Sequence, residues 1–182
     1  MNYQSIAVFC GSKSGDDPIY AAHAHKLGSL LAANGITLVY GGGSKGLMGT
    51  LADAVMAGGG KVIGVIPEIL LQWEHQHEGI TELIVVPDMH TRKRLMYERC
   101  DAAVILPGGY GTLDELFEML TWNTLNIHSK HIYILNSGEY YTHLIAHIQQ
   151  MEANGFLYEK PEQRIHMVDD PGAIFPSNAG KK

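Results

Sequence analysis

The sequence predicts an α/β fold: a Rossmann-like, doubly wound, mostly parallel sheet of about six to seven strands with helices on both faces. Short apolar runs rich in β-branched residues alternate with longer helical segments along most of the 182 residues. The runs are mostly apolar instead of alternating with polar residues, which is typical of strands buried on both faces of a parallel sheet. Strands and helices that alternate in this way form right-handed βαβ crossovers, so helices cover both faces.

Six of the runs are expected to be main strands, and a shorter segment fits an edge strand. The expected strands are residues 5–10, 37–40, 61–66, 82–86, 102–106 and 131–135, with 164–168 at the edge. In an open parallel sheet, ligands bind beyond the carboxyl ends of the strands, where the crossovers diverge. The functional residues should therefore lie in the segments that follow the strands.

Helix boundary signals support the same alternation. Between the first two strands, Asp17 can cap a helix that has Pro18 in its first turn and Asn34-Gly35 at its end. A second helix is expected over 46–57, where a run of three glycines follows, and another over 140–154. Residues 1–176 are therefore expected to form a single domain, with 177–182 as a frayed tail.

Composition excludes several classes of function. The chain has 13 basic and 19 acidic residues, a formal net charge of −6, and no stripe of Lys and Arg. Binding to nucleic acid or to an anionic membrane is therefore not expected. No apolar stretch approaches the ~20 residues of a membrane helix, and no targeting segment is recognisable, so we expect a cytoplasmic protein. Two distant cysteines, Cys10 and Cys100, favour a reducing compartment over a disulfide framework.

The ten histidines do not form a recognisable metal motif. His143 and His147 stand four residues apart on an expected helix, a spacing that can bind a metal ion. Two ligands with no evident third are more often a solvated helix face, so no metal site is predicted.

Glycine-rich segments follow three of the expected strands, at residues 9–12, 40–49 and 106–115. Glycine lets the backbone approach a ligand closely, and the free N–H groups of a following helix attract an anion such as phosphate. None of the three is a Walker loop or a complete GxGxxG fingerprint. Tight strand-to-helix turns alone also favour glycine, but three such loops at one sheet edge indicate a site, with Ser12, Gly42 and Gly43 as candidate ligands of the substrate.

The third loop leads into two carboxylates, Asp114 and Glu115, which are expected in the first turn of the next helix. Two interpretations of Glu115 are open. Thr112 and Glu115 have the spacing of a capping box, in which each side chain binds the other residue's backbone N–H. Alternatively, Glu115 points over the glycine loop and acts on whatever the loop holds.

A cationic cluster, Arg92-Lys93-Arg94, follows the fourth strand on the opening turns of a helix. Cations are disfavoured at a helix amino terminus, so the cluster needs a partner: an anionic ligand, or Glu115. A solvated charged face is the alternative, above all for Arg94. If the fourth and fifth strands are neighbours, as consecutive strands commonly are, Arg92 and Glu115 face each other across one crevice.

Three segments in this order and at these spacings resemble the LOG family of cytokinin riboside 5′-monophosphate phosphoribohydrolases: GGGSKGLMG, PDMHTRKRLM and PGGYGTLDE. The hallmark PGGxGTxxE is matched by residues 107–115 without a departure, and MHxRK is matched by residues 89–93. The similarity extends over nearly the whole chain. Family members have often been labelled "lysine decarboxylase", a name that this resemblance does not support.

The resemblance implies hydrolysis of the bond between base and ribose 5-phosphate in adenine-type nucleotides, AMP or prenylated cytokinin forms, with no metal or organic cofactor. It implies that Arg92 and Glu115 are the catalytic pair. The remaining residues that it implies bind the substrate are Glu68, Met89, Lys93, Gly108, Gly109, Tyr110, Gly111 and Thr112. Glu68 is the nearest match to a PxE-like segment, although the stretch 70–80 that follows is longer and richer in histidine than the family pattern. The resemblance also implies a homodimer.

Two other functions fit the same scaffold. A non-catalytic nucleotide carrier or sensor would need the phosphate-binding loops but neither Glu115 nor Arg92. A pyridoxal-dependent decarboxylase would need an aldimine lysine, for which Lys45 in the second glycine loop is conceivable. A colourless purified protein would exclude the decarboxylase.

Overall fold

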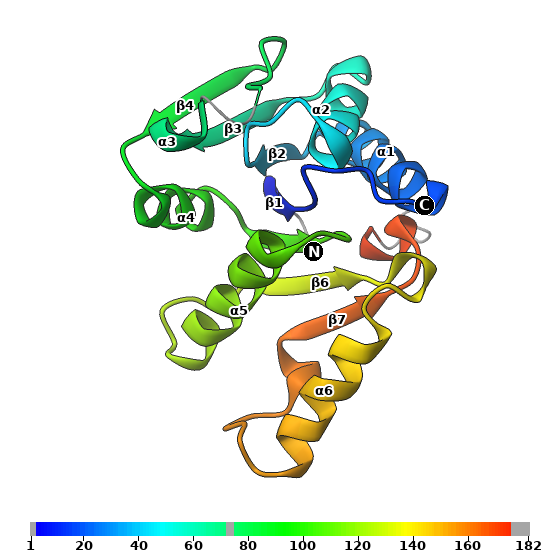
Figure 1. Ribbon diagram of the computed structural model, residues 1–182, viewed down its shortest axis with the longest axis vertical. Helices are drawn as coiled ribbons and strands as arrows, with labels where there is room; N and C mark the ends of the chain where they lie inside the picture. Colours follow the sequence, from blue (N-terminus) through cyan, green and yellow to red (C-terminus); the bar gives the residue numbers. More distant parts are fainter. Residues whose placement is uncertain (1–2, 72–74, 176–182) are drawn as a thin grey trace, which may run out of the picture.

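Seven parallel strands form one sheet in the order β4-β3-β2-β1-β5-β6-β7 (Figure 1). This computed structural model describes residues 3–71 and 75–175. The expected tail at 177–182 lies outside the described residues. The strands are β1 (Ser5–Phe9), β2 (Thr37–Tyr40), β3 (Val62–Pro67), β4 (Glu82–Val86), β5 (Ala102–Ile105), β6 (His131–Leu135) and β7 (Ile165–Val168). The α-helices are α1 (Pro18–Ala33), α2 (Gly46–Ala57), α3 (Glu68–Leu71), α4 (Met89–Glu98), α5 (Tyr110–Thr124) and α6 (Thr142–Ala153), and short 3₁₀ turns are η1 (Ser137–Glu139), η2 (Pro161–Gln163) and η3 (Pro171–Ile174).

The order of the strands reverses beside β1, at the centre of the sheet. The chain runs outward from β1 to β4, returns through α4 to β5 on the other side of β1, and continues outward to β7. Registers such as Ser5↔Thr37 with β2 and Ile6↔Ala102 with β5 fix β1 between its two neighbours. The predicted doubly wound α/β fold is confirmed, and its switch point lies at the carboxyl ends of β1 and β5.

The premise that the fourth and fifth strands are neighbours is wrong. β4 is the edge strand, and β3, β2 and β1 lie between it and β5. The reason is the doubly wound topology: after β4 the chain crosses back over the sheet, so consecutive strands at the reversal are far apart. Arg92 and Glu115 are brought together by helices on one face of the sheet.

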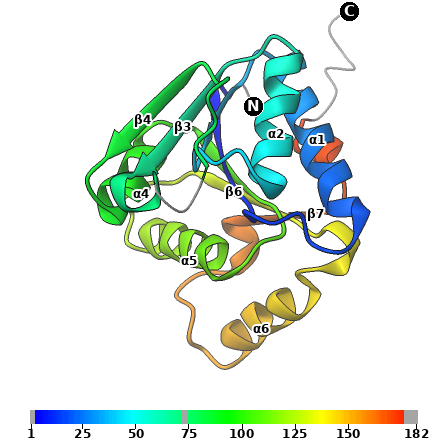
Figure 2. The same ribbon diagram turned by 45° about the horizontal axis from the view of Figure 1, so that its top comes forward.

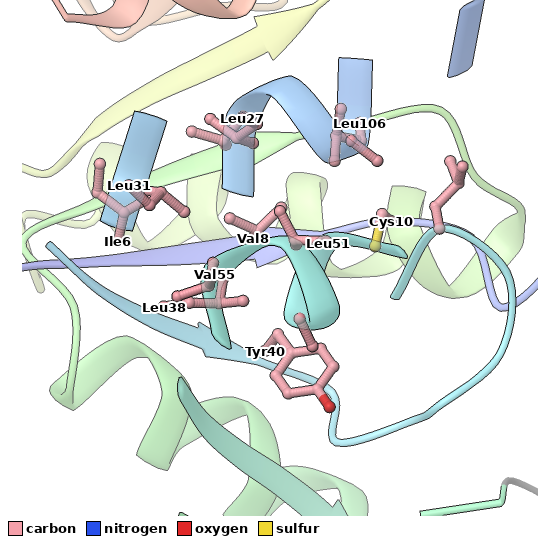
Figure 3. Packing of buried hydrophobic residues seen from close by; sticks show 14 of the residues in the cluster. Ile6, Val8, Cys10, Leu27, Leu31, Leu38, Tyr40, Leu51, Val55 and Leu106 are labelled. Atoms are coloured by element: carbon pink, nitrogen blue, oxygen red, sulfur yellow. The ribbon is translucent and has the colours of Figure 1, made fainter. Parts of the chain in front are cut away.

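Alternation along the strands divides the core into two clusters. Ile6 and Val8 of β1 face α1 and α2, whereas Ala7 and Phe9 face α4 and α5, because successive side chains of a strand point to opposite faces. Figure 3 shows the first cluster, with Tyr40 packed beneath α2. Both views of the ribbon show α1 and α2 on one side of the sheet and α4 and α5 on the other (Figures 1 and 2).

Local signals place the helix boundaries. The Asp17 carboxylate accepts a hydrogen bond from the Ile19 N–H at 2.9 Å, Pro18 is the first residue of α1, and Gly35 after its end has φ of +66°. The helix expected over 140–154 begins two residues later, since a 3₁₀ turn precedes α6. In the described part of the chain, no helix is both long and apolar enough to cross a membrane.

Candidate active site

The first and third glycine loops are joined at the switch point. The Gly11 N–H donates to the Pro107 carbonyl at 3.0 Å, and the Leu106 N–H donates to the Phe9 carbonyl at 2.9 Å. The second loop joins them, because the Leu47 N–H at the start of α2 donates to the Gly11 carbonyl at 3.1 Å. All three loops predicted from the sequence therefore meet at one edge of the sheet.

A pocket of about 370 Å³ opens between these loops, a size in the range of small-ligand sites. Its lining residues are Gly11, Ser12, Lys13, Ser14, Gly15, Tyr20, Leu47, Pro107, Gly108, Gly109 and Tyr140. The N-cap of α5 is Gly109, which has no side chain to bind the first N–H groups of the helix. Those N–H groups and the positive end of the helix dipole make this pocket suited to an anion.

The glycines of the third loop serve two different purposes. A Cβ atom at Gly108 would lie 2.2 Å from the Thr112 hydroxyl and 2.9 Å from the Gly11 nitrogen, so contacts within the protein require glycine there. A Cβ atom at Gly109 or Gly111 would meet no atom within 4 Å, and neither residue has a positive φ. The open space before Gly109 and Gly111 is therefore available to a ligand.

Two tyrosines that follow β6 hold the third loop in place. The Tyr141 hydroxyl, which is buried, donates to the Leu106 carbonyl at 2.7 Å, and the Tyr140 hydroxyl donates to the Gly108 carbonyl at 2.6 Å. Neither tyrosine was predicted from the sequence, and neither was Lys13, an exposed cation at the pocket. The only signal for them was their place after strands at the ligand-binding edge of the sheet.

Arg92 of α4 and Glu115 of α5 face each other on one side of the sheet. The Arg92 Nη2 atom lies 3.7 Å from the Glu115 Oε1 atom, and each residue is only 7% exposed. Gly41 makes room for the guanidinium, because a Cβ atom there would lie 2.3 Å from Arg92 Nη2. The structure thus brings together the two residues that the sequence analysis placed at the centre of the site.

The Arg92 guanidinium keeps donors for another molecule. Its Nε is buried without a hydrogen-bond partner among the described residues, and its Nη1 has the Met89 sulfur, a weak acceptor, at 3.8 Å. A buried guanidinium is costly unless its donors are satisfied. An electron-rich ligand would complete its contacts.

The capping-box interpretation of Glu115 is wrong. The helix begins at Tyr110 with Gly109 as its N-cap, and no side chain caps it. Thr112 lies inside the first turn, buried beside Gly108, and Asp114 and Glu115 follow it, beyond the first turn in which they were expected. Because the glycine loop itself adopts the capping conformation, Glu115 is left to point at Arg92.

Lys93 lies apart from the pocket. Its Nζ is 2.6 Å from Glu118 Oε2 and 3.0 Å from Asp114 Oδ2, and the residue is 8% exposed. Burial by itself lowers the pKa of Lys93, but the hydrogen bonds to Glu118 and Asp114 outweigh burial and raise the pKa of the ammonium. The partners of the cationic cluster are therefore carboxylates, and exposed Arg94 faces Glu98 at 4.0 Å.

The other residues expected to bind the substrate are spread around this edge. Ser12 is exposed in the pocket, whereas Tyr110 is 94% exposed at the start of α5. Gly42 and Gly43 pair with the segment 75–77, through the His77 N–H to the Gly42 carbonyl at 3.0 Å and a bridge between Gly43 and Gln76. Glu68 is exposed at the end of β3. These five positions border the edge of the sheet, and of the five only Ser12 lines the pocket.

Among the described residues, no three His, Cys, Asp or Glu side chains gather in a way that could hold a metal ion. His143 and His147 are both exposed on α6.

The parallel doubly wound sheet defines a Rossmann-like α/β protein, and the anion-suited pocket at its switch point with the nearby buried Arg–Glu pair is its candidate site. Comparison with known proteins identifies the family. Residues 48–177 match the family described as "Possible lysine decarboxylase". A cytokinin riboside 5′-monophosphate phosphoribohydrolase from Rhodococcoides fascians is 45% identical over 94% of this chain and 87% of its own length. Another with that name, from Arabidopsis thaliana, is 46% identical over 94% of this chain and 78% of its own. The chain belongs to the LOG family.

Solved structures support the fold. The molybdenum cofactor carrier protein of Chlamydomonas reinhardtii has a TM-score of 0.71 at 19% identity, covering 93% of this chain and 92% of its own. A molybdenum cofactor binding protein of Rippkaea orientalis has a TM-score of 0.67 at 18% identity, and the match covers 96% of this chain and 94% of its own. At this identity the likeness is one of fold.

Proposed function

We propose that this chain hydrolyses the N-glycosidic bond of adenine-type nucleoside 5′-monophosphates, AMP or cytokinin riboside monophosphates, to free base and ribose 5-phosphate. The single observation that carries this proposal is the buried Arg92–Glu115 pair beside a pocket suited to phosphate. Thr112 connects the two, because it packs against Gly108 of the pocket and lies one turn before Glu115 on α5. The names of relatives about 45% identical over most of the chain support the same activity.

The chemistry of the pair suits this reaction. When the bond between C1′ and the base nitrogen breaks, positive charge develops on the ribose, and the Glu115 carboxylate stabilises it. Water then forms the new bond to C1′, and Glu115 orients that water and takes its proton, which passes to the departing base. Arg92 remains charged at every accessible pH, so it fixes the carboxylate and the electron-rich edge of the substrate but does not donate a proton.

Replacement of Glu115 by Gln tests the proposal. The amide keeps the shape of the side chain but neither stabilises a cation nor accepts a proton, so base release should fall by about 10²-fold or more. The wild type and Glu115→Gln would be incubated with AMP, isopentenyladenosine monophosphate, GMP and CMP, and the released base separated by chromatography. Glu98→Gln, an exposed carboxylate on α4, is the matched control and should retain full activity.

Binding of the nucleotides by the wild type without release of base would instead support a carrier or sensor. A pyridoxal-dependent decarboxylation has less support, because Lys45 is an exposed residue at the N-cap of α2. The name of the matching family therefore does not describe the chemistry of this site.

We also propose that the chain is a cytoplasmic homodimer that joins through the outer face of α5. Phe117 and Leu125 of this region are 37% and 63% exposed, and an apolar groove of about 310 Å³ lies beside them, bordered by Phe156 and Tyr158. None of the residues lining the groove belongs to the glycine loops, so it is separate from the proposed active site.

Light scattering at micromolar concentration should give the mass of two chains, and Leu125→Asp should shift the mass to one chain because it places a charge in the contact. Thr50→Asp, on α2 across the sheet, should leave the mass unchanged. A wild-type monomer would refute the dimer.

A further inference from the structure

Four side chains form a charged contact between α4 and α5, next to the Arg92–Glu115 pair. The Lys93 ammonium lies 2.6 Å from Glu118 Oε2 and 3.0 Å from Asp114 Oδ2. The Tyr97 hydroxyl donates to Glu118 Oε2 at 3.2 Å and lies 3.4 Å from the main-chain carbonyl of Glu115. We call this group, Lys93, Tyr97, Asp114 and Glu118, the helix clamp.

The clamp is built on matching turns of the two helices. Lys93 and Tyr97 are four residues apart on α4, and Asp114 and Glu118 are four residues apart on α5, so each pair lies on one face of its helix. Lys93 directly follows Arg92, and Asp114 directly precedes Glu115. A change in the distance between the clamp residues therefore changes the distance between the reacting side chains.

The charges of the clamp do not suit a phosphate ligand. One ammonium faces two carboxylates, so the group carries a net negative charge that repels an anion. Lys93 is 8% exposed, and it is not among the residues that line the pocket. Removing the ammonium would take away the cation of α4 that pairs with Glu118 and Asp114 of α5, so the contact between the two helices would weaken.

We propose that Lys93 is a positioning residue: through Glu118 and Asp114 it locks α4 to α5 at the separation that lets Arg92 and Glu115 act together. This proposal rests on the phosphoribohydrolase function proposed above, and it differs from the substrate-binding role that the family resemblance implies for Lys93. The 3.7 Å between Arg92 Nη2 and Glu115 Oε1 is longer than the 2.6 Å and 3.0 Å contacts by which Lys93 joins the same two helices. Its position depends on where α4 lies.

Steady-state kinetics distinguish a positioning residue from a phosphate ligand. For Lys93→Met we expect kcat on the adenine nucleotide that the wild type cleaves best to fall about 10- to 100-fold, because a shift of about 1 Å between reacting groups has effects of this size. KM and the inhibition constant of ribose 5-phosphate should stay within about threefold of the wild type, since the pocket is untouched.

Glu118→Gln changes the contact from the α5 side and should have the same effect as Lys93→Met: a lower kcat with a nearly unchanged KM. Because glutamine still forms hydrogen bonds, this variant can be measured even if Lys93→Met does not fold. In the double variant, kcat should fall little below that of the worse single variant, because both changes open the same contact. Lys26→Met is the matched control: Lys26 pairs with Asp170 at the same 2.6 Å on the other face of the sheet, and its loss should leave kcat and KM unchanged.

A KM and a ribose 5-phosphate inhibition constant that both rise tenfold or more in Lys93→Met, with kcat unchanged, would overturn the proposal and assign Lys93 to the phosphate. Amide hydrogen exchange gives a readout that does not need turnover: α4 should exchange faster in Lys93→Met and in Glu118→Gln than in Lys26→Met. If α4 exchanges faster in the two clamp variants but the wild type releases no base, the proposed function is refuted and the helix clamp is not. Unchanged exchange would refute the clamp.

Discussion

Gly108 and Gly109, adjacent in the third loop, are glycine for different physical reasons. Gly108 is fixed by its neighbours, with the Thr112 hydroxyl and the Gly11 nitrogen in the place of its missing side chain. Gly109 has no such neighbour and is the N-cap of α5 at the edge of the pocket. The sequence motif presents the two as equivalent, and only the packing separates a glycine needed for the fold from one that leaves room for a ligand.

Alanine substitutions at these two positions should therefore have opposite consequences. Gly108→Ala should destabilise the protein by about 1–3 kcal/mol, the usual cost of overpacking a tight site. Gly109→Ala should change stability by less than about 1 kcal/mol, but it should weaken the inhibition of base release by ribose 5-phosphate, because a methyl group occupies space before the helix N–H groups. Urea unfolding and inhibition measured on both variants check this. Equal stability losses would contradict the distinction.

Secondary-structure elements were predictable because their signals are local. The runs of β-branched residues match all seven strands to within about one residue at each end, and the Asp17-Pro18 cap and the glycines after α1 and α2 mark helix boundaries that the structure confirms. The meeting of three glycine loops also followed from the rule for parallel sheets.

The arrangement of elements was less accessible from the sequence. β4 and β5 are consecutive yet separated by three strands, so Arg92 and Glu115 meet through α4 and α5 rather than across adjacent strands. The partners of Lys93 could not be foreseen either, because contacts between helices depend on how two faces are turned toward each other. The start of α5 at Tyr110 was hidden by the Thr112–Glu115 spacing, which imitates a cap.

The whole molecule carries a set of histidines whose environments oppose protonation. Burial lowers the pKa of His23 and His128 below 6.5, and burial followed by the nearby His131 lowers the pKa of His166. The three lie on different elements: α1, the segment before β6, and β7. Their titration therefore acts on the stability of the fold as a whole.

Proton linkage determines whether these histidines make the fold more or less stable as the pH rises. With a folded-state pKa below the unfolded value, the unfolded chain binds more protons in this pH range, so stability rises with pH. The contribution of these histidines to the stability of the fold is fully present above about pH 6.5, and it is lost as the pH falls through their lower folded-state pKa values. Hydrogen bonds from Thr91 and from Lys26 lower the pKa of Asp88 and Asp170 below 3.8, so these carboxylates stay ionised throughout this range and their effect belongs to more acidic solutions.

We therefore expect the urea midpoint of unfolding to be lower at about pH 5.5 than at about pH 7.5, because charging these half-buried imidazoles favours the unfolded chain. The triple variant His23→Gln, His128→Gln, His166→Gln should lose less of its stability over the same interval, since glutamine does not titrate. His25→Gln, an exposed histidine on α1, should behave as the wild type. Circular dichroism can follow the urea unfolding of all three proteins at both pH values. An equal drop in the urea midpoint of the wild type and the triple variant would mean that other groups cause the loss of stability in acid.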